Sequence, residues 1–592
     1  MKRVISNCYY CLFFRISLLL SFCLYLSSIL ITINDSESIN QWKAFFLWFG
    51  GIAILPLGLG IKKLILVSKK KRNYLLIMER KERITFISIV VLALIFSFLF
   101  LVRYPFVSIY DQVRDGGLNT YQIISGLIKN IFSYGRYGSH GLIIPVLNIP
   151  FYKIFGPSVL TFRFPAALLA TMDVVLLYFV AKRSVSEEMA PIASLILLTL
   201  PLHLYYGRTE IVVMYSSFFT SLLLLILCIL LEKNDLNLYG LLGLIAGFSS
   251  NFHTSIRTVA LFTVFLIFFI SFHRIRNDGF KKTIAKLIVI IIFFMIGFGP
   301  RILFSPAQTF FQLRSLRINN SPLFLLENYK KSILVYFKEP TFSTHYPDFR
   351  PILDPLLAFF FIIGFLFALF QSKNKFLKIL CLYILVIPLI NSAITDAVNS
   401  DNRLLPTLPI ISLITGYGFY NFLRPISRFR VLLTSLLIIW LIVKGIIFFS
   451  SESAAKNYQL QDYLSMHAIY FLKFHPKYQV FENYCLNVSP KNFNYFKLMH
   501  VQEQYQYFLP GKDVYIIKDE SLNDNQLVIS ASCTGDFQKS TVGKNYCLRR
   551  EKFVCPLTGS FIIFSEEGSL FSKTLIIQKE FIRINSQDSL AP

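Results

Sequence analysis

Long apolar segments recur along most of this chain and restrict its fold more than any other feature. A helix needs about 20 consecutive apolar residues to cross the hydrocarbon core of a membrane. Windows of that kind fall at 11–33, 43–67, 84–103, 157–181, 188–206, 211–232, 237–253, 258–272, 282–303, 353–371, 376–394, 403–424 and 429–450. Only 16% of the residues are charged, which excludes a soluble globular protein. We therefore predict a multi-spanning α-helical membrane protein with about 13 transmembrane helices.

Basic residues gather in five of the loops between these windows. The loops are 69–83, 182–183, 273–282, 373–378 and 424–430. The predicted spans put all five on one side, which the positive-inside rule makes cytoplasmic. The N-terminus is then cytoplasmic and the C-terminus extracytoplasmic, in a plasma membrane or bacterial inner membrane. The net charge of +26 reflects this topology and contact with anionic membrane lipids, so nucleic acid is not expected as a partner.

The C-terminal residues differ in kind from the apolar part. Runs at 513–517, 526–530, 561–564 and 574–577, separated by turn residues, predict strands in a small extracytoplasmic α+β domain over 451–592. Four cysteines there, Cys485, Cys533, Cys547 and Cys555, allow three disulfide pairings, and the sequence does not choose among them. The remaining boundaries follow: residues 1–83 form two N-terminal helices and a basic loop, and 84–450 form the main transmembrane domain.

A charged segment follows the third apolar window. Asp111, Arg114 and Asp115 lie within five residues at the edge of the predicted membrane, and charge in such a place is often functional. Other polar residues occupy helix ends on the same predicted side. They are Arg136, His140, Arg208, Glu210, His253, Arg257, Arg301, Asp396, Asp401 and Arg403. This pattern predicts an outward-facing cleft at headgroup level, where arginines hold a lipid phosphate and a carboxylate accepts a proton.

Three stretches resemble one family. The segment from Asp111 to Gly117 resembles the first-loop motif of GT-C glycosyltransferases, in the group that includes protein O-mannosyltransferases and aminoarabinose transferases, glycosyltransferase family 39. The segments 201–210 and 402–409 resemble that group's second outer turn and late helix start. The resemblance covers about 84–450. It implies a GT-C catalytic domain there and an inverting transfer from a polyprenyl-phosphate sugar to a lipid, glycan or protein acceptor, with Asp111 as base.

The motif departs from the family at one position, and several residues have simpler explanations. Many members have Glu where this chain has Gln112, so Asp115 is the candidate for a second carboxylate, one helical turn from Asp111. Asp111 could instead cap a helix, and Asp115 could be a solvated surface residue.

The basic candidates are equally open. Arg114, Arg208, Arg257, Arg301 and Arg403 are candidate phosphate ligands on charge and position. Arg114 could pair with neighbouring carboxylates, Arg208 with Glu210 in a structural ion pair, and Arg403 could anchor its helix at the interface. His253 could be an ordinary helix-end histidine, or could hold a divalent metal with Asp111 and Glu210; no cofactor is certain.

Two other functions fit the same features. A lipid-linked sugar flippase would need polar residues at mid-membrane depth, where Asp173 is the one exception to the helix-end pattern. An oligosaccharide polymerase or ligase would share the carrier lipid. The sugar, the acceptor and the oligomeric state cannot be read from the sequence.

Overall fold

The computed structural model describes a mostly helical protein in two compact units. The described residues are 2–34, 38–58, 79–102, 113–128, 131–132, 141–209, 211–275, 279–303, 322–341, 350–394, 401–426, 428–450, 479–483, 507, 514–516, 526–530, 561–564, 574–577 and 582–585. The helical unit comprises Met1–Leu99, Gln122–Leu147 and Arg163–Ser450, and the second unit comprises Phe100–Tyr121, Asn148–Phe162 and Ser451–Pro592.

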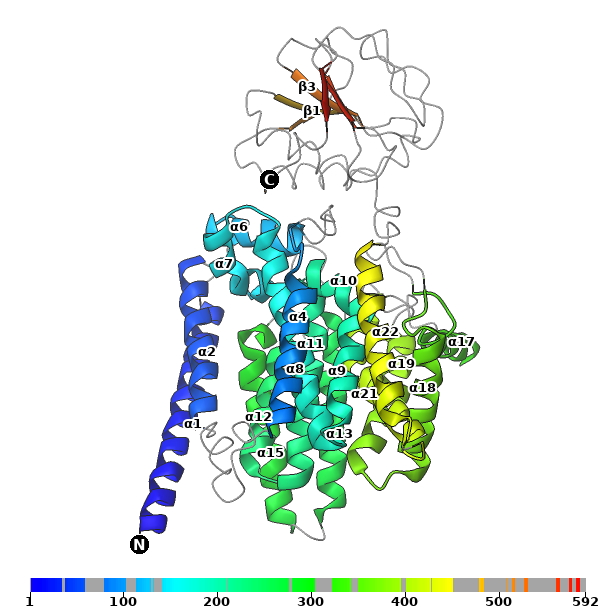
Figure 1. Ribbon diagram of the computed structural model, residues 1–592. Helices are drawn as coiled ribbons and strands as arrows, with labels where there is room; N and C mark the ends of the chain where they lie inside the picture. Colours follow the sequence, from blue (N-terminus) through cyan, green and yellow to red (C-terminus); the bar gives the residue numbers. More distant parts are fainter. Residues whose placement is uncertain are drawn as a thin grey trace. The chain divides into compact units, whose positions relative to one another are not determined.

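Each of the thirteen predicted windows contains described helical residues (Figure 1). The longer helices are α1 (Lys2–Asn34), α2 (Ser38–Gly58), α4 (Arg80–Phe98), α7 (Ile143–Phe155), α8 (Leu160–Ser184), α9 (Met189–Thr199), α10 (Pro201–Thr209), α11 (Ile211–Lys233), α12 (Leu236–Ser249), α13 (Thr254–His273), α15 (Phe280–Phe298), α17 (Pro322–Leu334), α18 (Pro355–Leu366), α19 (Lys375–Ile394), α21 (Leu408–Leu423) and α22 (Arg430–Ser450). Short helical turns are η2 (Arg114–Leu118), α6 (Asn119–Ile124), η3 (Gly299–Leu303), η4 (Phe367–Gln371), α20 (Asp401–Leu404) and η5 (Leu405–Thr407).

Fewer helices than windows have the dimensions of a full membrane span. Within the described residues, six helices are long and apolar enough to cross a membrane, or seven if α9 and α10 form one broken span. The prediction of an integral membrane protein is confirmed at that level, and the count of thirteen spans stays a prediction. Window 188–206 differs from the expected single helix because Pro201 interrupts it. Proline lacks an N–H and disfavours the helical conformation of the residue before it, and α9 and α10 meet at a bend of 63°.

Glycines let two helix pairs of the helical unit approach closely. On α12, a Cβ at Gly243 would lie 2.5 Å from the Ile290 carbonyl oxygen of α15. Gly297 of α15 faces the backbone of α12 in the same way, and Gly364 of α18 faces the backbone of α21. Small residues at such crossings replace side-chain contacts with direct backbone packing, as is common in membrane helices.

The N-terminal helices belong to the helical unit. Ser28 of α1 donates to the Ala44 carbonyl of α2 at 2.6 Å, which ties the two helices together. Trp48 of α2 is buried, and its indole N–H donates to the Ile296 carbonyl of α15 at 2.7 Å. A buried indole N–H needs such a partner. The pair therefore docks at the end of α15.

Contacts join the five predicted basic loops at one end of the helical unit. The joined residues are Lys182–Glu82, Arg183–Glu232, Arg430–Glu188, Arg274–Leu231 and Asn374–Ser184. The structure thus gathers the loops that the topology placed together, while the compartment that this end faces stays a prediction.

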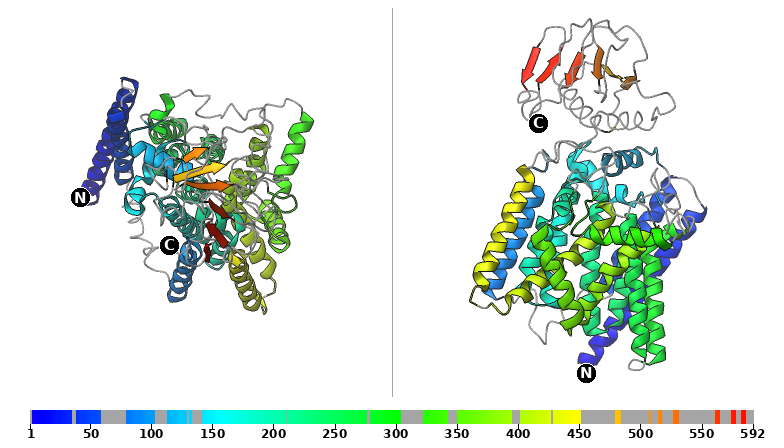
Figure 2. Two further views of the ribbon diagram at one scale, coloured as in Figure 1. Left: turned by 90° about the horizontal axis from the view of Figure 1, so that it is seen from above. Right: turned by 90° about the vertical axis from the view of Figure 1, so that its right-hand side faces the viewer.

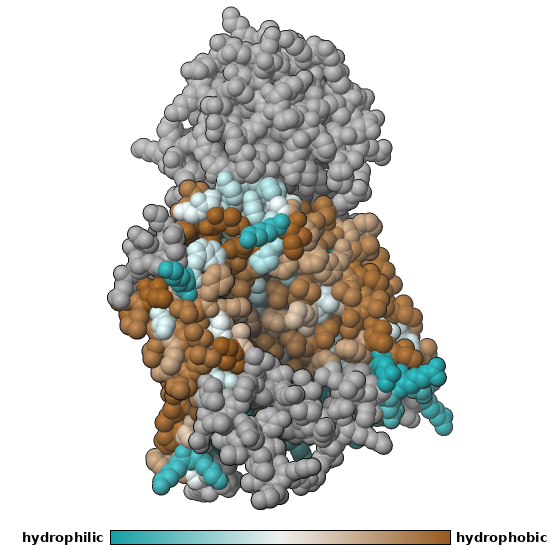
Figure 3. Space-filling model, turned by 90° about the vertical axis from the view of Figure 1, so that its left-hand side faces the viewer, coloured by the Kyte–Doolittle hydropathy of each residue, from teal (hydrophilic) through white to brown (hydrophobic). Residues whose placement is uncertain are grey.

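The flank of the helical unit in Figure 3 is largely hydrophobic, with its most hydrophilic side chains near the margins. Helix α22 also has large apolar side chains exposed along one side. They are Leu432, Leu436, Ile439, Val443 and Ile447. A stripe with this spacing follows one helix face, and in a membrane protein such a face contacts lipid.

Six strands of the second unit form one sheet (Figure 2). They are β1 (Gln479–Asn483), β2 (Val514–Ile516), β3 (Gln526–Ser530), β4 (Phe561–Phe564), β5 (Thr574–Ile577) and β6 (Ile582–Asn585). The order is β2-β1-β3-β4-β5-β6; the pairs from β2 to β4 are parallel and those from β4 to β6 antiparallel. All four predicted runs contain strands, and β1 and β6 are additional. The α+β assignment and the disulfides stay predictions, because the rest of 451–592, with its four cysteines, lies outside the described residues.

Candidate functional site

The Asp111–Gly117 motif leads into an unusual backbone turn. Asp111 and Gln112 lie outside the described residues, and from Arg114 to Leu118 the backbone forms the π-helical turn η2. Because Asp111 lies outside the described residues, the expectation that Asp111 and Asp115 share one face stays a prediction. π-Turns are uncommon and often occur at functional sites.

A side chain from α7 explains how this turn is held. The amide nitrogen of Asn148, which is fully buried, donates to the Gly116 carbonyl. Thr120 Oγ1 lies 3.5 Å from the same oxygen. A carbonyl that accepts bonds from two side chains is drawn away from the regular helical ladder, a recognised cause of local distortion. Asn148 is thus a motif-contacting residue that the sequence reasoning missed.

One residue of the C-terminal segment packs directly on the motif. Tyr507 is fully buried, and a Cβ at Gly117 would lie 2.5 to 2.9 Å from three atoms of its ring. Its hydroxyl donates to the Ser158 carbonyl at 2.9 Å, and its ring lies beside Tyr152, with centroids 6.2 Å apart. Gly117 is therefore a position where only a hydrogen atom fits. Burial raises the pKa of the Tyr507 phenol, and its hydrogen bonds with Thr161 and Ser158 act in the opposite direction.

Arg208 is used to complete a helix end. It lies in the last turn of α10, is fully buried, and its Nη1 donates to the Phe96 carbonyl at 2.7 Å and to that of Ser97 at 3.2 Å. Its Nη2 donates to the Leu99 carbonyl. The last carbonyls of a helix lack partners and carry partial negative charge, so a buried guanidinium there stabilises the end of α4.

Arg257 and Arg301 meet at the turn between α12 and α13. Arg257 Nε donates to the Ser250 carbonyl at 2.9 Å, and Arg301 Nη1 donates to the Asn251 carbonyl at 2.6 Å. Both side chains are buried. A Cβ at Gly141 would lie 2.9 Å from the Arg301 guanidinium carbon, so a glycine there leaves room for it. The structure thus brings these two predicted phosphate ligands together, and each donates to a backbone carbonyl of the same turn.

His253 caps α13. Its Nδ1 lies 3.3 Å from the Ser255 backbone nitrogen, whose N–H it accepts, and 2.7 Å from Ser255 Oγ. Ser255 Oγ in turn donates to Ser216 Oγ of α11 at 2.9 Å. A metal at His253 would therefore have to use Nε2. No group of three metal-ligating side chains occurs among the described residues, and Asp111 and Glu210 lie outside them. The metal site stays a prediction.

The other predicted residues are placed less fully. Arg403 lies in α20, which packs against α13, and its side chain is partly exposed. The backbone of Arg114 and Asp115 belongs to η2, and their side chains lie outside the described part of the chain, as does Glu210. Whether these residues form one cleft with Asp111 stays a prediction.

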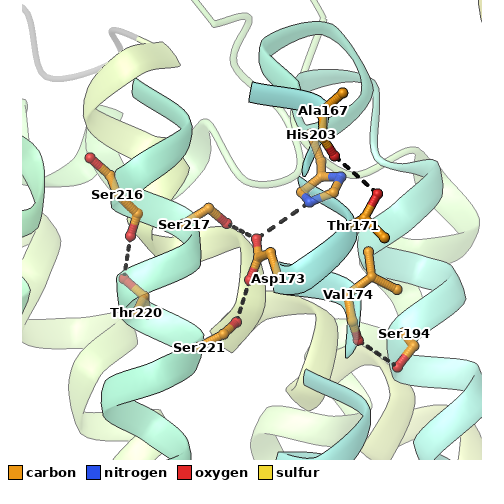
Figure 4. A network of polar contacts seen from close by, with 10 residues as sticks. All are labelled: Ala167, Thr171, Asp173, Val174, Ser194, His203, Ser216, Ser217, Thr220 and Ser221. Atoms are coloured by element: carbon orange, nitrogen blue, oxygen red, sulfur yellow. Dashed lines mark hydrogen bonds and ion pairs between the residues drawn. The ribbon is translucent and has the colours of Figure 1, made fainter. Parts of the chain in front are cut away.

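A second polar cluster lies inside the helical unit, where the sequence singled out only Asp173 (Figure 4). Asp173 of α8 is fully buried. Ser217 of α11 donates to its Oδ2 at 2.5 Å, Ser221 donates to its Oδ1, and His203 Nε2 of α10 lies 3.3 Å from Oδ2. The two serines are four residues apart and so share one face of α11. The sequence signal for this cluster was an aspartate in one apolar segment together with two serines, four residues apart, in another.

Comparison with known proteins supports the family resemblance. Residues 139–302 match the sequence model of the dolichyl-phosphate-mannose-protein mannosyltransferase family. No curated protein sequence matches the chain. Similar solved structures include ArnT from Cupriavidus metallidurans bound to undecaprenyl phosphate, at 11% identity and a TM-score of 0.47, covering 74% of this chain and 86% of that one.

Another similar structure is the archaeal oligosaccharyltransferase AglB from Archaeoglobus fulgidus, in complex with an inhibitory peptide and a dolichol-phosphate. Identity is 10% and the TM-score is 0.42, and the match covers 72% of this chain and 63% of that one. The resemblance predicted from the motifs is confirmed by the family match over residues 139–302, which lie among the apolar helices.

Proposed function

We propose that this protein transfers a sugar from a polyprenyl-phosphate carrier to an acceptor on the outer face of the membrane, with inversion at the anomeric carbon. Asp111 serves as the base. The acceptor is a lipid, a glycan or a protein. The carrier phosphate lies at headgroup level, where the lipid places it, and the sugar faces the outer compartment.

The chemistry needs few groups. An acceptor hydroxyl oxygen attacks the anomeric carbon while the bond from that carbon to the phosphate oxygen breaks, and the hydroxyl proton passes to the Asp111 carboxylate. The lipid phosphate leaves as a stabilised anion, so a strong general acid is not required. Cationic groups near the phosphate favour its release, because charge-assisted bonds strengthen as negative charge develops.

One contact carries the proposal. The family match begins at residue 139 and does not include the Asp111–Gly117 motif. Asn148 lies inside the matched segment, and its side chain holds the Gly116 carbonyl inside the motif. The motif is therefore anchored by the segment that has the family's sequence pattern, which supports reading its first aspartate in the family's terms.

The arginines are assigned by their surroundings. Arg257 and Arg301 meet at one turn, and both are candidate phosphate ligands on charge and position. Arg208 donates hydrogen bonds to carbonyls of α4, which supports a structural role in addition to any contact with phosphate. Arg114 and Arg403 complete the proposed set, with Glu210 orienting groups at the end of α10. The domain from residue 451 shapes acceptor access.

The test is a strain that lacks the protein, complemented with wild type or with Asp111→Asn. Loss of transfer should make one polyprenyl-phosphate monosaccharide accumulate and one glycoconjugate disappear. The Asn variant should reach wild-type abundance in the membrane yet leave the accumulation unrelieved. A matched control is Asp235→Asn, at the N-cap of α12, where Asp235 accepts from the Asn237 backbone and Asn also caps well. Full relief by the Asp111 variant would refute its role as base.

The flippase alternative receives no support from Asp173. Asp173 is enclosed by three side chains and fully buried, so it is part of a closed cluster rather than the wall of a path. A polymerase or ligase would transfer a preassembled glycan, and the accumulating lipid-linked species would then be an oligosaccharide.

A further inference from the structure

The half-helix α10 is held at both of its ends. Pro201 separates it from α9 at a bend of 63°, and every residue from Leu202 to Thr209 is buried. Near its start, His203 lies 3.3 Å from the Asp173 carboxylate. At its end, Arg208 binds the last carbonyls of α4. The two anchors are five residues apart, about 7 to 8 Å along the helix axis.

The Asp173 cluster divides into two parts with different consequences. Ser217 and Ser221 both belong to α11, so their bonds join α8 to α11. Among the contacts of the described residues, His203 alone joins the cluster to α10. Since α8 and α11 are spans of 25 and 23 residues and α10 has only nine, the short helix is the element free to shift when a contact is lost.

Burial makes each contact of the Asp173 carboxylate energetically important. A carboxylate inside a membrane protein is costly unless it is paired and hydrogen-bonded, and removing a partner leaves the remaining groups unsatisfied. In the structure the carboxylate has a partner from each of its two neighbouring elements (Figure 4). A buried ion pair is weak evidence for added stability, and in some proteins it serves to fix one geometry.

We propose that Asp173 and His203 are positioning residues that fix α10, and through it Arg208 in the last turn of that helix, for binding of the polyprenyl-phosphate carrier. This inference rests on the proposed function. Neither residue touches the carrier; both act by setting where the end of α10 lies. The serines hold the carboxylate, and the histidine transmits its position.

The test combines amide exchange with carrier binding, in purified full-length protein in lipid nanodiscs. His203→Leu should speed hydrogen–deuterium exchange in the peptide covering 201–209 by about 5- to 150-fold, the range expected for losing one buried polar partner. Exchange in α8 and α11 should stay near wild type. His203→Gln, which keeps an amide N–H able to reach the carboxylate, should restore most of the protection. Asp173→Asn should loosen α10 as His203→Leu does, and the double variant should be no worse than the worse single one.

The binding arm uses undecaprenyl phosphate as the probe. His203→Leu should raise its Kd at least tenfold, and His203→Gln should return it to within about threefold of wild type. The matched control is Ser194→Ala, which removes a buried hydroxyl close by that bonds only the Val174 carbonyl and should change neither readout.

The outcomes separate the two claims. Wild-type protein that does not bind undecaprenyl phosphate would refute the proposed function, while the exchange experiment would still decide the positioning claim. Unchanged exchange at 201–209 in His203→Leu, or exchange raised equally in all helices, would overturn the positioning claim. So would loss of α10 protection with unchanged carrier affinity in a protein whose wild type binds.

Discussion

A methyl group at residue 117 should loosen the turn that follows Asp111. The Cβ of Gly117→Ala would lie 2.5, 2.7 and 2.9 Å from three atoms of the Tyr507 ring, against about 3.5 to 4 Å for relaxed carbon contacts. The ring cannot swing away easily, because its hydroxyl is bonded to the Ser158 carbonyl and the side chain is fully buried. The overlap of about 1 Å must therefore be relieved by the backbone of η2.

Overpacking of this size costs about 1 to 3 kcal/mol. Because the cost falls on η2, amide exchange in a peptide covering 113–124 should speed up by about 5- to 150-fold, where 1.4 kcal/mol corresponds to tenfold. The assay is hydrogen–deuterium exchange of the full-length protein in nanodiscs. Gly50→Ala is the matched control: it changes a helical glycine with no atom within 4 Å of the added Cβ, so exchange at 113–124 should not change.

A double variant tests the reasoning itself. Tyr507→Ala alone should also loosen the turn, since it removes a buried aromatic ring. In that background, however, the methyl group of Gly117→Ala meets no ring, so adding it should cost almost nothing. The two changes should thus be strongly non-additive, by the full 1 to 3 kcal/mol of the overlap. Additive effects, or wild-type exchange in Gly117→Ala, would show that Tyr507 does not define the space at Gly117.

Two further outcomes are expected. Gly243→Ala should lower the thermal unfolding midpoint clearly more than Gly240→Ala. The Cβ added at residue 243 would lie 2.5 Å from the Ile290 carbonyl oxygen, whereas the one added at residue 240 would lie 3.3 Å from a Phe293 ring atom. Equal effects would contradict backbone packing of α12 on α15. Burial raises the pKa of Tyr507 above 10.0. Its neutral form therefore contributes stability that is fully present below pH 10 and is lost as the pH rises toward the raised pKa. The difference in thermal unfolding midpoint between wild type and Tyr507→Phe should thus hold steady below pH 10 and shrink above it.

Local sequence was sufficient to locate the helices, because hydrophobicity over about 20 residues is a property of each segment alone. It did not locate the break at Pro201, since the window 188–206 remains apolar across the proline. The proline itself was the available signal, as helices usually end before such a residue. The consequence is large for the site: α10 becomes a separate short helix that carries Arg208 on its last turn.

The sequence predicted which positions carry the site residues, but it did not predict the atoms that these residues contact. Charge at helix ends singled out Arg208, Arg257 and Arg301, yet the atoms they bind are backbone carbonyls, which no sequence pattern displays. Tyr507 could not be anticipated on Gly117 for a related reason. The two residues are far apart in the chain, and a tyrosine among many others carries no mark of its partner. Asp173 is intermediate, because its serine partners had helical spacing but its histidine partner depended on the bend.

The helix-end arginines explain why charge gathers where the sequence pattern placed the cleft. A helix that stops within an apolar bundle leaves carbonyls unsatisfied, and a guanidinium can bind two of them at once, as Arg208 does on α4. The same fork geometry suits phosphate oxygens. An arginine that moved to the carrier would therefore have to abandon carbonyls that water cannot reach. Those with the fewest backbone bonds lose least by turning to phosphate. Arg208 therefore loses much, because its withdrawal would uncap α4.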